Sequence, residues 1–133
     1  MHLGSWVAGE LADPANFPTT GSATYTGHAI GNVYSAGDSY NAVGSYSNTW
    51  DFGSRRGTVA MDFDNVNYTG ETRLRDNSIT FDGVLEATGR EGAVHGNFIQ
   101  SESDPAAAVA GRFAVQNTEG DDYRASGTFA GEK

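Results

Sequence analysis

The fold of this chain is decided by the stretch Tyr123-Arg124-Ala125-Ser126-Gly127-Thr128-Phe129, in which apolar or small residues alternate with polar ones. This alternation has the period of a β-strand with one dry face and one wet face. Residues 40–46, 94–98 and 109–113 repeat it. Glycine weakens strands, so its recurrence on the dry face needs a reason. A tightly curled sheet supplies one, because the missing side chain makes room for an aromatic ring from a neighbouring strand.

Length, composition and charge limit the class of protein. The chain has 133 residues, the size of one domain, and no cysteine, which excludes disulfides and thiolate metal sites. Its 17 acidic and 8 basic residues give a net charge of -9, so a nucleic-acid backbone or an anionic membrane would repel it. No apolar run approaches the roughly 18 residues of a membrane-spanning helix. We therefore predict neither a nucleic-acid partner nor membrane insertion.

Turn-forming residues divide the chain into predicted strands, and almost no helix is expected. The strands are predicted at 3–10, 22–34, 40–51, 57–64, 66–75, 78–87, 92–100, 108–116 and 122–130. Their short connections make sequence neighbours antiparallel. Residues 1–21 are assigned to an N-terminal strand and connection and residues 22–133 to a barrel, together one domain (1–133) excised from a larger protein.

Sorting each strand by alternate positions separates a dry face from a wet one. The dry positions are Tyr25, Gly27, Ala29, Gly31, Val33, Tyr40, Ala42, Gly44, Tyr46, Val59, Met61, Phe63, Val66, Tyr68, Gly70, Ile79, Phe81, Gly83 and Leu85, with the repeats at 94–98, 109–113 and 123–129. A membrane barrel would be apolar outside, so the pattern predicts a soluble, all-β, eight-stranded antiparallel up-and-down barrel with a filled interior. A flattened barrel or a two-sheet sandwich would give nearly the same alternation and stays open.

Three segments resemble a known family: residues 21–31, the hairpin over 59–70, and the ending over 109–131. Their alternation of glycine and aromatic residues is similar to that of the β-barrel domain of transferrin-binding protein B and related bacterial surface lipoproteins. The resemblance implies an eight-stranded antiparallel barrel, displayed at the bacterial cell surface or outside the cell. It also implies a role in protein binding.

The chain departs from that family's pattern in three ways. The Gly-Pro-x-Ala-x-Glu turn that usually joins the last two strands is replaced by a different sequence at residues 114–122, and the lipidated cysteine and the handle domain are absent. Transferrin itself is therefore not the partner that we predict. A similar module appended to a large secreted or surface protein of an environmental bacterium fits the sequence better.

The sequence contains no constellation typical of catalysis or metal binding. His28 and His95 lie on the wet face of separate strands and His2 lies near the start, as surface histidines do. There is no Gly-x-Ser-x-Gly elbow, and no carboxylate is placed in an apolar pocket that would shift its pKa. Residues 62–67, rich in Asp and Asn, are predicted to form a hairpin turn, with a calcium loop as the alternative. We predict no enzymatic activity, no cofactor and no metal.

The connections of an up-and-down barrel alternate between its two rims. One rim is predicted to collect the short segments 35–39, 64–66, 88–91 and 117–121. The opposite rim is predicted to collect longer segments, 50–56, 75–78 and 101–107, together with the N-terminal connection. Trp6 in the N-terminal strand is expected to cover a sheet edge or plug one end, or else to pair with another domain of a longer parent.

Four residues of the longer rim are predicted to bind a partner: Trp50, Arg55, Arg56 and Arg75. An exposed Trp beside Arg is typical of interface hot spots, and long loops on a rigid scaffold often bind partners. The alternative is structural. In that interpretation Trp50 tucks under the rim, and the arginines pair with Asp51 and Asp76.

Three functions are compatible with this sequence. The first, which we favour, is a non-catalytic extracellular or cell-surface module that recognises a protein or other macromolecule through one rim. The second is a structural spacer or cap in a large bacterial surface protein. The third is a lipocalin-like carrier of a small ligand, which requires an empty interior. The sequence names no ligand and leaves the oligomeric state open.

Overall fold

The computed structural model describes residues 10–75, 78–118, 120 and 122–133 of the chain. Apart from one short 3-10 helix, η1 (Pro14–Asn16), its regular elements are strands, as the sequence predicts. Their bounds are β1 (Glu10–Leu11), β2 (Ser22–Ser35), β3 (Asp38–Asp51), β4 (Arg56–Phe63), β5 (Val66–Leu74), β6 (Thr80–Ala87), β7 (Arg90–Gln100), β8 (Ala108–Asn117) and β9 (Tyr123–Glu132). The described residues hold no helix that would be long and apolar enough to span a bilayer.

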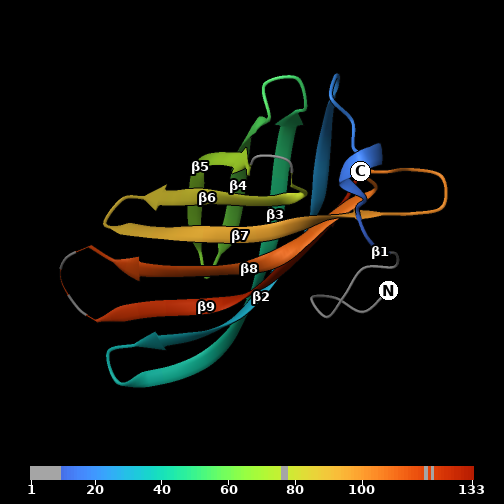
Figure 1. The fold of residues 1–133 in the computed structure, drawn as a ribbon. Helices are drawn as coiled ribbons and strands as arrows, with labels where there is room; N and C mark the ends of the chain where they lie inside the picture. Colours follow the sequence, from blue (N-terminus) through green and yellow to red (C-terminus); the bar gives the residue numbers. More distant parts are fainter. Residues whose placement is uncertain (1–9, 76–77, 119, 121) are drawn as a thin grey trace.

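The strands β2 to β9 form a closed antiparallel barrel (Figure 1). Each pairs with the next along the chain, because the connections are short, and β9 returns to pair with β2 from Thr26↔Glu132 to Ser35↔Tyr123. The pairing of β9 with β2 decides between the barrel and the two-sheet sandwich, which the alternation of dry and wet residues left open. A sandwich would leave β2 and β9 on separate sheets, whereas here they share one continuous ladder.

The interior of the barrel is filled by side chains from the predicted dry face. The largest fully buried side chains are Trp50, Tyr25, Tyr46, Tyr68, Phe63, Phe81, Phe98, Phe129, Met61, Leu85, Val33 and Val94. Tyr46 stacks on Phe129 with ring centroids 4.1 Å apart, and Trp50 meets Phe81 edge to face at 5.2 Å. A carrier of the lipocalin type needs an open cavity here, so the packed rings argue against that function.

The glycines of the dry face sit where adjacent strands come unusually close. A Cβ on Gly127 would lie 2.0 Å from the carbonyl oxygen of Ile30, and one on Gly111 would lie 2.0 Å from that of His95. At Gly96 the nearest atom would instead be Cζ of Phe81, at 2.5 Å. The sequence predicts that glycines of the dry face make room for aromatic rings, and this prediction is confirmed at Gly96. At the other two positions the space is occupied by the neighbouring backbone.

Tyr40 departs from the predicted dry face, since 44% of it is exposed. The ladder between β3 and β4 begins only at Ser45↔Asp62, so the first residues of β3 extend beyond β4 in a hairpin with β2. Tyr40 therefore has β2 but no residue of β4 beside it in the ladder, and its hydroxyl reaches Asp64 in the β4–β5 turn while the ring stays partly exposed. The placement of Tyr40 in the interior was therefore wrong.

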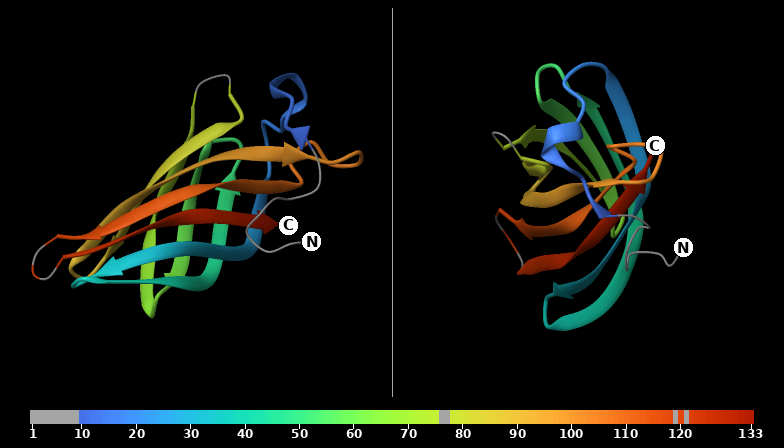
Figure 2. Two further views of the ribbon diagram at one scale, coloured as in Figure 1. Left: turned by 90° about the horizontal axis from the view of Figure 1, so that it is seen from below. Right: turned by 45° about the vertical axis from the view of Figure 1, so that its right-hand side comes forward.

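The connections gather at two rims as predicted (Figure 2). We call one the short-turn rim, made of the β2–β3, β4–β5, β6–β7 and β8–β9 connections. The other, the long-loop rim, is made of the β3–β4, β5–β6 and β7–β8 connections and residues 12–21. The alternation of rims follows from antiparallel pairing of successive strands.

The N-terminal segment covers a sheet edge and plugs the barrel mouth at the long-loop rim. Most of the predicted strand 3–10, with Trp6, lies outside the described residues. Leu11 in β1 pairs with Ile99 of β7, where β7 extends past β6, and the Ala12 amide donates to the Phe98 carbonyl at 3.0 Å. Phe17 then packs into the mouth, 4.8 Å from the ring of Phe98 and 5.5 Å from that of Phe52.

Candidate functional site

Trp50, predicted as an exposed anchor for a partner, is fully buried beneath the long-loop rim. Its position near the end of β3 has inward parity, and its ring packs against Phe81 and Phe98. The structural alternative therefore holds for this residue. The prediction that Trp50 contacts a partner directly is therefore corrected. Its side chain is closed off from solvent and belongs to the core.

A buried polar network holds Trp50 in place. Its indole Nε1 donates to Oδ1 of Asn48 at 2.8 Å, and the Tyr46 hydroxyl donates to the same oxygen at 3.0 Å. Nδ2 of Asn48 donates to the Thr58 carbonyl at 2.8 Å and to Oγ1 of Thr72 at 3.2 Å. Burial raises the pKa of the Tyr46 phenol, so it stays protonated as a donor. Every polar group here has a partner, which stabilises the core and leaves none free for chemistry.

Arg55 fastens one long loop to the next. Its backbone has a φ of 61°, and its carbonyl accepts from the Leu74 amide at 3.0 Å. Its guanidinium donates to the carbonyl of Arg75 and to that of Ser78, the latter at 3.4 Å. The β3–β4 and β5–β6 loops are thus tied together by one side chain. This use of Arg55 leaves it little freedom to reach a partner.

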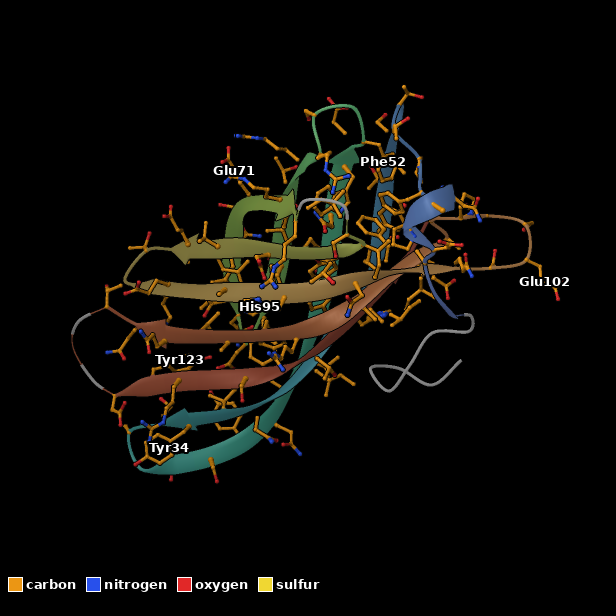
Figure 3. All side chains as sticks on the ribbon, viewed as in Figure 1. Tyr34, Phe52, Glu71, His95, Glu102 and Tyr123 are labelled. Atoms are coloured by element: carbon orange, nitrogen blue, oxygen red, sulfur yellow. The ribbon has the colours of Figure 1, made fainter. Side chains whose placement is uncertain are left out.

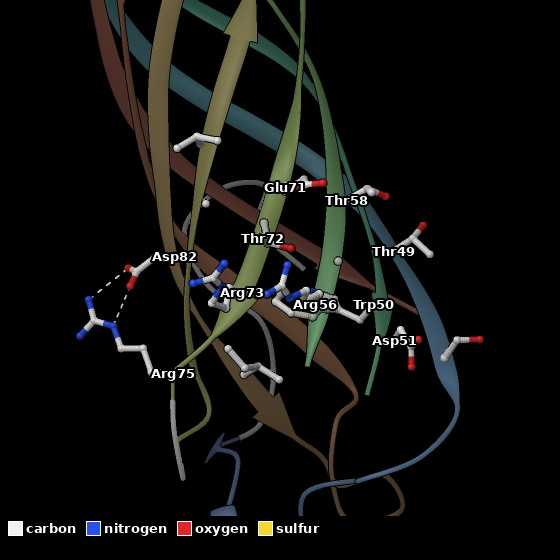
Figure 4. Close-up of a pocket in the computed structure, with 15 residues that line it drawn as sticks. Thr49, Trp50, Asp51, Arg56, Thr58, Glu71, Thr72, Arg73, Arg75 and Asp82 are labelled. Carbon is white, nitrogen blue, oxygen red and sulfur yellow. Dashed lines mark hydrogen bonds and ion pairs between the residues drawn. The ribbon is translucent and has the colours of Figure 1, made fainter. Parts of the chain in front are cut away.

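Arg75 binds Asp82 in a two-point ion pair (Figure 4). The Nε–Oδ2 distance is 2.7 Å and the second guanidinium nitrogen donates to Oδ1 at 3.1 Å. His95 also contacts Oδ1 of Asp82. The hydrogen bonds from Arg75 lower the pKa of the Asp82 carboxyl. The sequence proposed Asp51 and Asp76 as arginine partners. Asp76 lies outside the described residues, and Asp51 instead accepts from the Gly53 amide at 3.0 Å.

Arg56 faces Arg73 directly across the ladder between β4 and β5. Both side chains are exposed, and in the part of the chain that the structure describes neither forms a hydrogen bond or an ion pair. Like charges placed opposite each other in a sheet repel. Sequence reasoning singled out Arg56 but missed Arg73. The signal was available, because the hairpin turn at Asp64 and Asn65 fixes the register that brings the two together.

A groove of about 720 Å³ lies on the outer wall beneath the long-loop rim. It crosses β3, β4, β5 and β6, and Arg56 and Arg73 lie at its centre (Figure 4). Exposed side chains at alternate positions edge it, among them Thr58, Glu71 and Val84. The groove therefore combines two arginines at its centre with acidic, polar and apolar neighbours, outside a barrel that is itself full.

The short-turn rim is closed by a cluster of phenols around one carboxylate. Oδ2 of Asp64 accepts from the Tyr40 hydroxyl at 2.6 Å and from the Tyr123 hydroxyl at 2.8 Å. Burial first, and then the Asp64 hydrogen bond, raise the pKa of Tyr123. The guanidinium of Arg90 lies 3.4 Å over the Tyr123 ring and donates to Tyr68 at 3.3 Å. Figure 3 shows Tyr123 at this end and Phe52 at the other.

The predicted hairpin turn over residues 62–67 is confirmed. Asp64 and Asn65 have φ values of 51° and 63°, the left-handed conformation of a tight two-residue hairpin turn. In the described ranges, no group of three or more His, Asp or Glu side chains is placed to hold a metal ion.

No protein-family model and no curated protein matches the chain. Solved structures do match it. A single-site mutant of the vaccine antigen transferrin-binding protein B from Haemophilus parasuis Hp5 superposes with a TM-score of 0.70 at 21% identity. A double mutant of that protein gives 0.72 at 19%, and intact Ap-TbpB with its N and C lobes gives 0.68 at 19%. Each match covers 92% of this chain but only 28% of the other. The predicted resemblance is thus confirmed at the level of the fold, an eight-stranded barrel that this chain shares with part of transferrin-binding protein B.

Proposed function

We propose that this chain is a non-catalytic binding module, displayed at the bacterial surface or outside the cell, that recognises a protein partner through the long-loop rim and the wall beneath it. The observation that carries the proposal is the position of basic charge on an acidic molecule. Four of the 8 basic residues, Arg55, Arg56, Arg73 and Arg75, gather at this rim although the net charge is -9. When the few basic residues of an acidic protein lie together on one face, that face favours a partner with acidic groups.

The rigidity of the rim supports this proposal. Besides the Arg55 contacts, the Tyr25 hydroxyl donates to the Ala106 carbonyl at 2.6 Å, and Lys133 pairs with Asp104 at 2.8 Å. These contacts anchor the β7–β8 connection from inside and outside the barrel. A surface already ordered before binding loses less conformational entropy when a partner arrives.

The fold likeness supports the class of partner by analogy. The similar solved structures are of proteins named for binding transferrin, which is itself a protein. A shared fold does not transfer a ligand, and this chain spans 28% of the length of those chains, so transferrin serves as one defined probe among others.

The test compares two matched double variants of the purified chain. The rim variant carries Arg56→Ala and Arg75→Ala, and the control carries Arg112→Ala and Arg124→Ala, two exposed arginines away from the long-loop rim. Immobilised wild-type and variant proteins are exposed to transferrin and to secreted and surface proteins of the source bacterium and its surroundings. Retained proteins are identified by mass spectrometry, and their affinities are measured by calorimetry.

We expect a partner that wild type and control bind equally and that the rim variant binds at least tenfold more weakly. A partner whose affinity is unchanged by the rim variant would place binding elsewhere and contradict the proposal. If no protein is retained above an unrelated barrel used as background, the structural spacer or capping function takes precedence.

A further inference from the structure

We propose that the groove across β3, β4, β5 and β6 binds an extended acidic segment of the partner protein, with Arg56 and Arg73 holding its carboxylates. This inference deepens the proposed function and rests on it for the class of partner. It moves the site from the loops of the rim to the outer wall beneath them. Three features of the groove support this inference: the charge of the two arginines, the engagement of the acids around them, and the size of the groove.

The first step is that, among the residues that the structure describes, neither guanidinium group forms a hydrogen bond or an ion pair. Arg56 and Arg73 are directly opposite each other in the ladder, where side chains start about 5 Å apart. Their mutual repulsion disfavours the empty groove. An anion placed between them removes that repulsion and gains two charge-assisted contacts. The free energy of binding therefore includes two charge-assisted contacts that the free protein does not make.

The second step is that the nearest acids are already engaged. The cross-strand neighbour of Arg56 on β3 is Asp51, whose Oδ1 accepts from the Gly53 amide at 3.0 Å. The cross-strand neighbour of Arg73 on β6 is Asp82, which is held by Arg75 at 2.7 Å. Asp51 and Asp82 reduce the positive charge across the ladder, but their hydrogen bonds go to other groups, so both guanidinium groups keep their donors for a ligand. Glu71, opposite Thr58, is the acid left at the edge of the groove.

The third step is the size and chemistry of the groove. Four adjacent strands at a spacing of about 4.8 Å span about 14 Å, the length of about four residues of extended chain. Guanidinium groups match carboxylates at two points each. Val84, 55% exposed, offers an apolar contact beside them. The fit is thus to a short segment with two carboxylates and an adjacent apolar side chain. A nucleic-acid chain carries a charge at every nucleotide beyond the groove as well, so the net charge of -9 opposes it more strongly than a short segment whose charge is confined to the groove.

The experiment measures binding of two labelled peptides by fluorescence anisotropy. One peptide has the sequence Val-Glu-Ser-Glu-Val, and its neutral match has Val-Gln-Ser-Gln-Val, both with blocked termini. The proteins are wild type, the groove variant Arg56→Gln with Arg73→Gln, and the control variant Arg112→Gln with Arg124→Gln. We expect the acidic peptide to bind wild type and control within twofold of each other. Its affinity for the groove variant is expected to fall at least tenfold, because both carboxylate-binding forks are lost.

Three outcomes would overturn the proposal. One is equal binding of the two peptides, and another is undiminished binding to the groove variant. The third is that inorganic phosphate or an oligonucleotide of equal charge competes at the groove as well as the acidic peptide does, which would make the arginines a general anion site.

These results are separable from those of the proposed function. The peptide assay uses the purified chain and needs no natural partner. If a partner is captured through the rim but the acidic peptide ignores the groove, the binding function stands and this inference fails. If the peptide binds as expected but no natural partner is retained, the groove is real and the proposed function fails.

Discussion

Phe17 closes one mouth of the barrel with an aromatic ring, whereas Asp64 closes the other by accepting hydrogen bonds from two tyrosines. The apolar closure uses a segment that crosses the mouth before the first barrel strand begins. The polar closure uses a two-residue turn and side chains of the strands themselves. Both ends are shut, so the binding that we propose uses the outside of the molecule.

The difference between the mouths has a physical basis in their connections. Long loops bury backbone and need apolar contacts to stay in place, which Phe17, Phe52 and Ala106 supply. Short turns stay near water, where a carboxylate keeps its charge at little cost and can bind phenols strongly. The long-loop rim is the more heavily buried end, and it also positions the exposed arginines.

The largest loss of stability is expected in the barrel wall, which runs between the two mouths. Gly127→Val puts a side chain where a Cβ would already be 2.0 Å from a backbone oxygen, so it should destabilise by about 3 kcal/mol or more or prevent folding. Ser126→Val is the matched control, because it adds the same side chain one residue away on the exposed face. Urea unfolding followed by circular dichroism measures both. A stable Gly127→Val protein would contradict the interior assignment on which the comparison depends.

Removing the apolar plug should have the next largest effect. Phe17→Ala deletes a ring that is 8% exposed and contacts two other rings, so we expect a loss of about 3 kcal/mol. Leu11→Ala, at a residue 63% exposed, should change stability by less than about 0.5 kcal/mol. Hydrogen exchange at the Phe98 amide should quicken only in the first variant. Equal stability of the two variants would show that the mouth does not need its plug.

The polar mouth should be less sensitive. Asp64→Asn keeps an oxygen acceptor for Tyr123 and suits the φ of 51°, but it removes the charge that strengthens both hydrogen bonds. We expect a loss of about 1 kcal/mol in urea unfolding, the difference between charged and neutral acceptors. A loss as large as that of Phe17→Ala would mean that the two closures are energetically equivalent, against the comparison drawn here.

The smallest loss of stability is expected at the exposed ion pair between Arg75 and Asp82, on the outer wall at the long-loop rim. The folded pKa of Asp82 is lowered, so its contribution to stability is present above its ordinary pKa of about 3.9 and is lost as the pH falls through the lowered value. Asp82→Asn should therefore be slightly less stable than wild type at pH 7, and the gap should close below pH 4. Thr58→Ala, an exposed substitution on the same wall that removes no titratable group, serves as the control and should show no such gap. Thermal melts at several pH values measure this, and a pH-independent gap would contradict it.

Much of the fold followed from local patterns. The strands predicted at 22–34 and 108–116 match Ser22–Ser35 and Ala108–Asn117 within one residue at each end. Alternation and turn chemistry act over a few residues, so they can be recognised in the sequence. Tyr40 shows the limit, because its exposure depends on where the neighbouring strand ends.

The candidate site was predicted less well for the same reason. The sequence placed Trp50 and three arginines at one rim, which is correct, but their roles depend on contacts between strands. Trp50 is buried by Phe81 and Phe98, and Arg55 is occupied by backbone carbonyls of another loop. Binding of a partner at this rim stays a prediction, and Arg56 and Arg73 are now the residues on which it depends.

By itself, the sequence determined that this chain alternates dry and wet positions along short antiparallel strands, and that small and aromatic residues share the dry face. Those properties are local, because the period of a strand fixes which side each residue faces. Only the tertiary structure decided that the sheet closes, that Phe17 plugs one mouth and that Arg56 meets Arg73. Such contacts join residues far apart in sequence, and they depend on the register and curvature of the whole barrel.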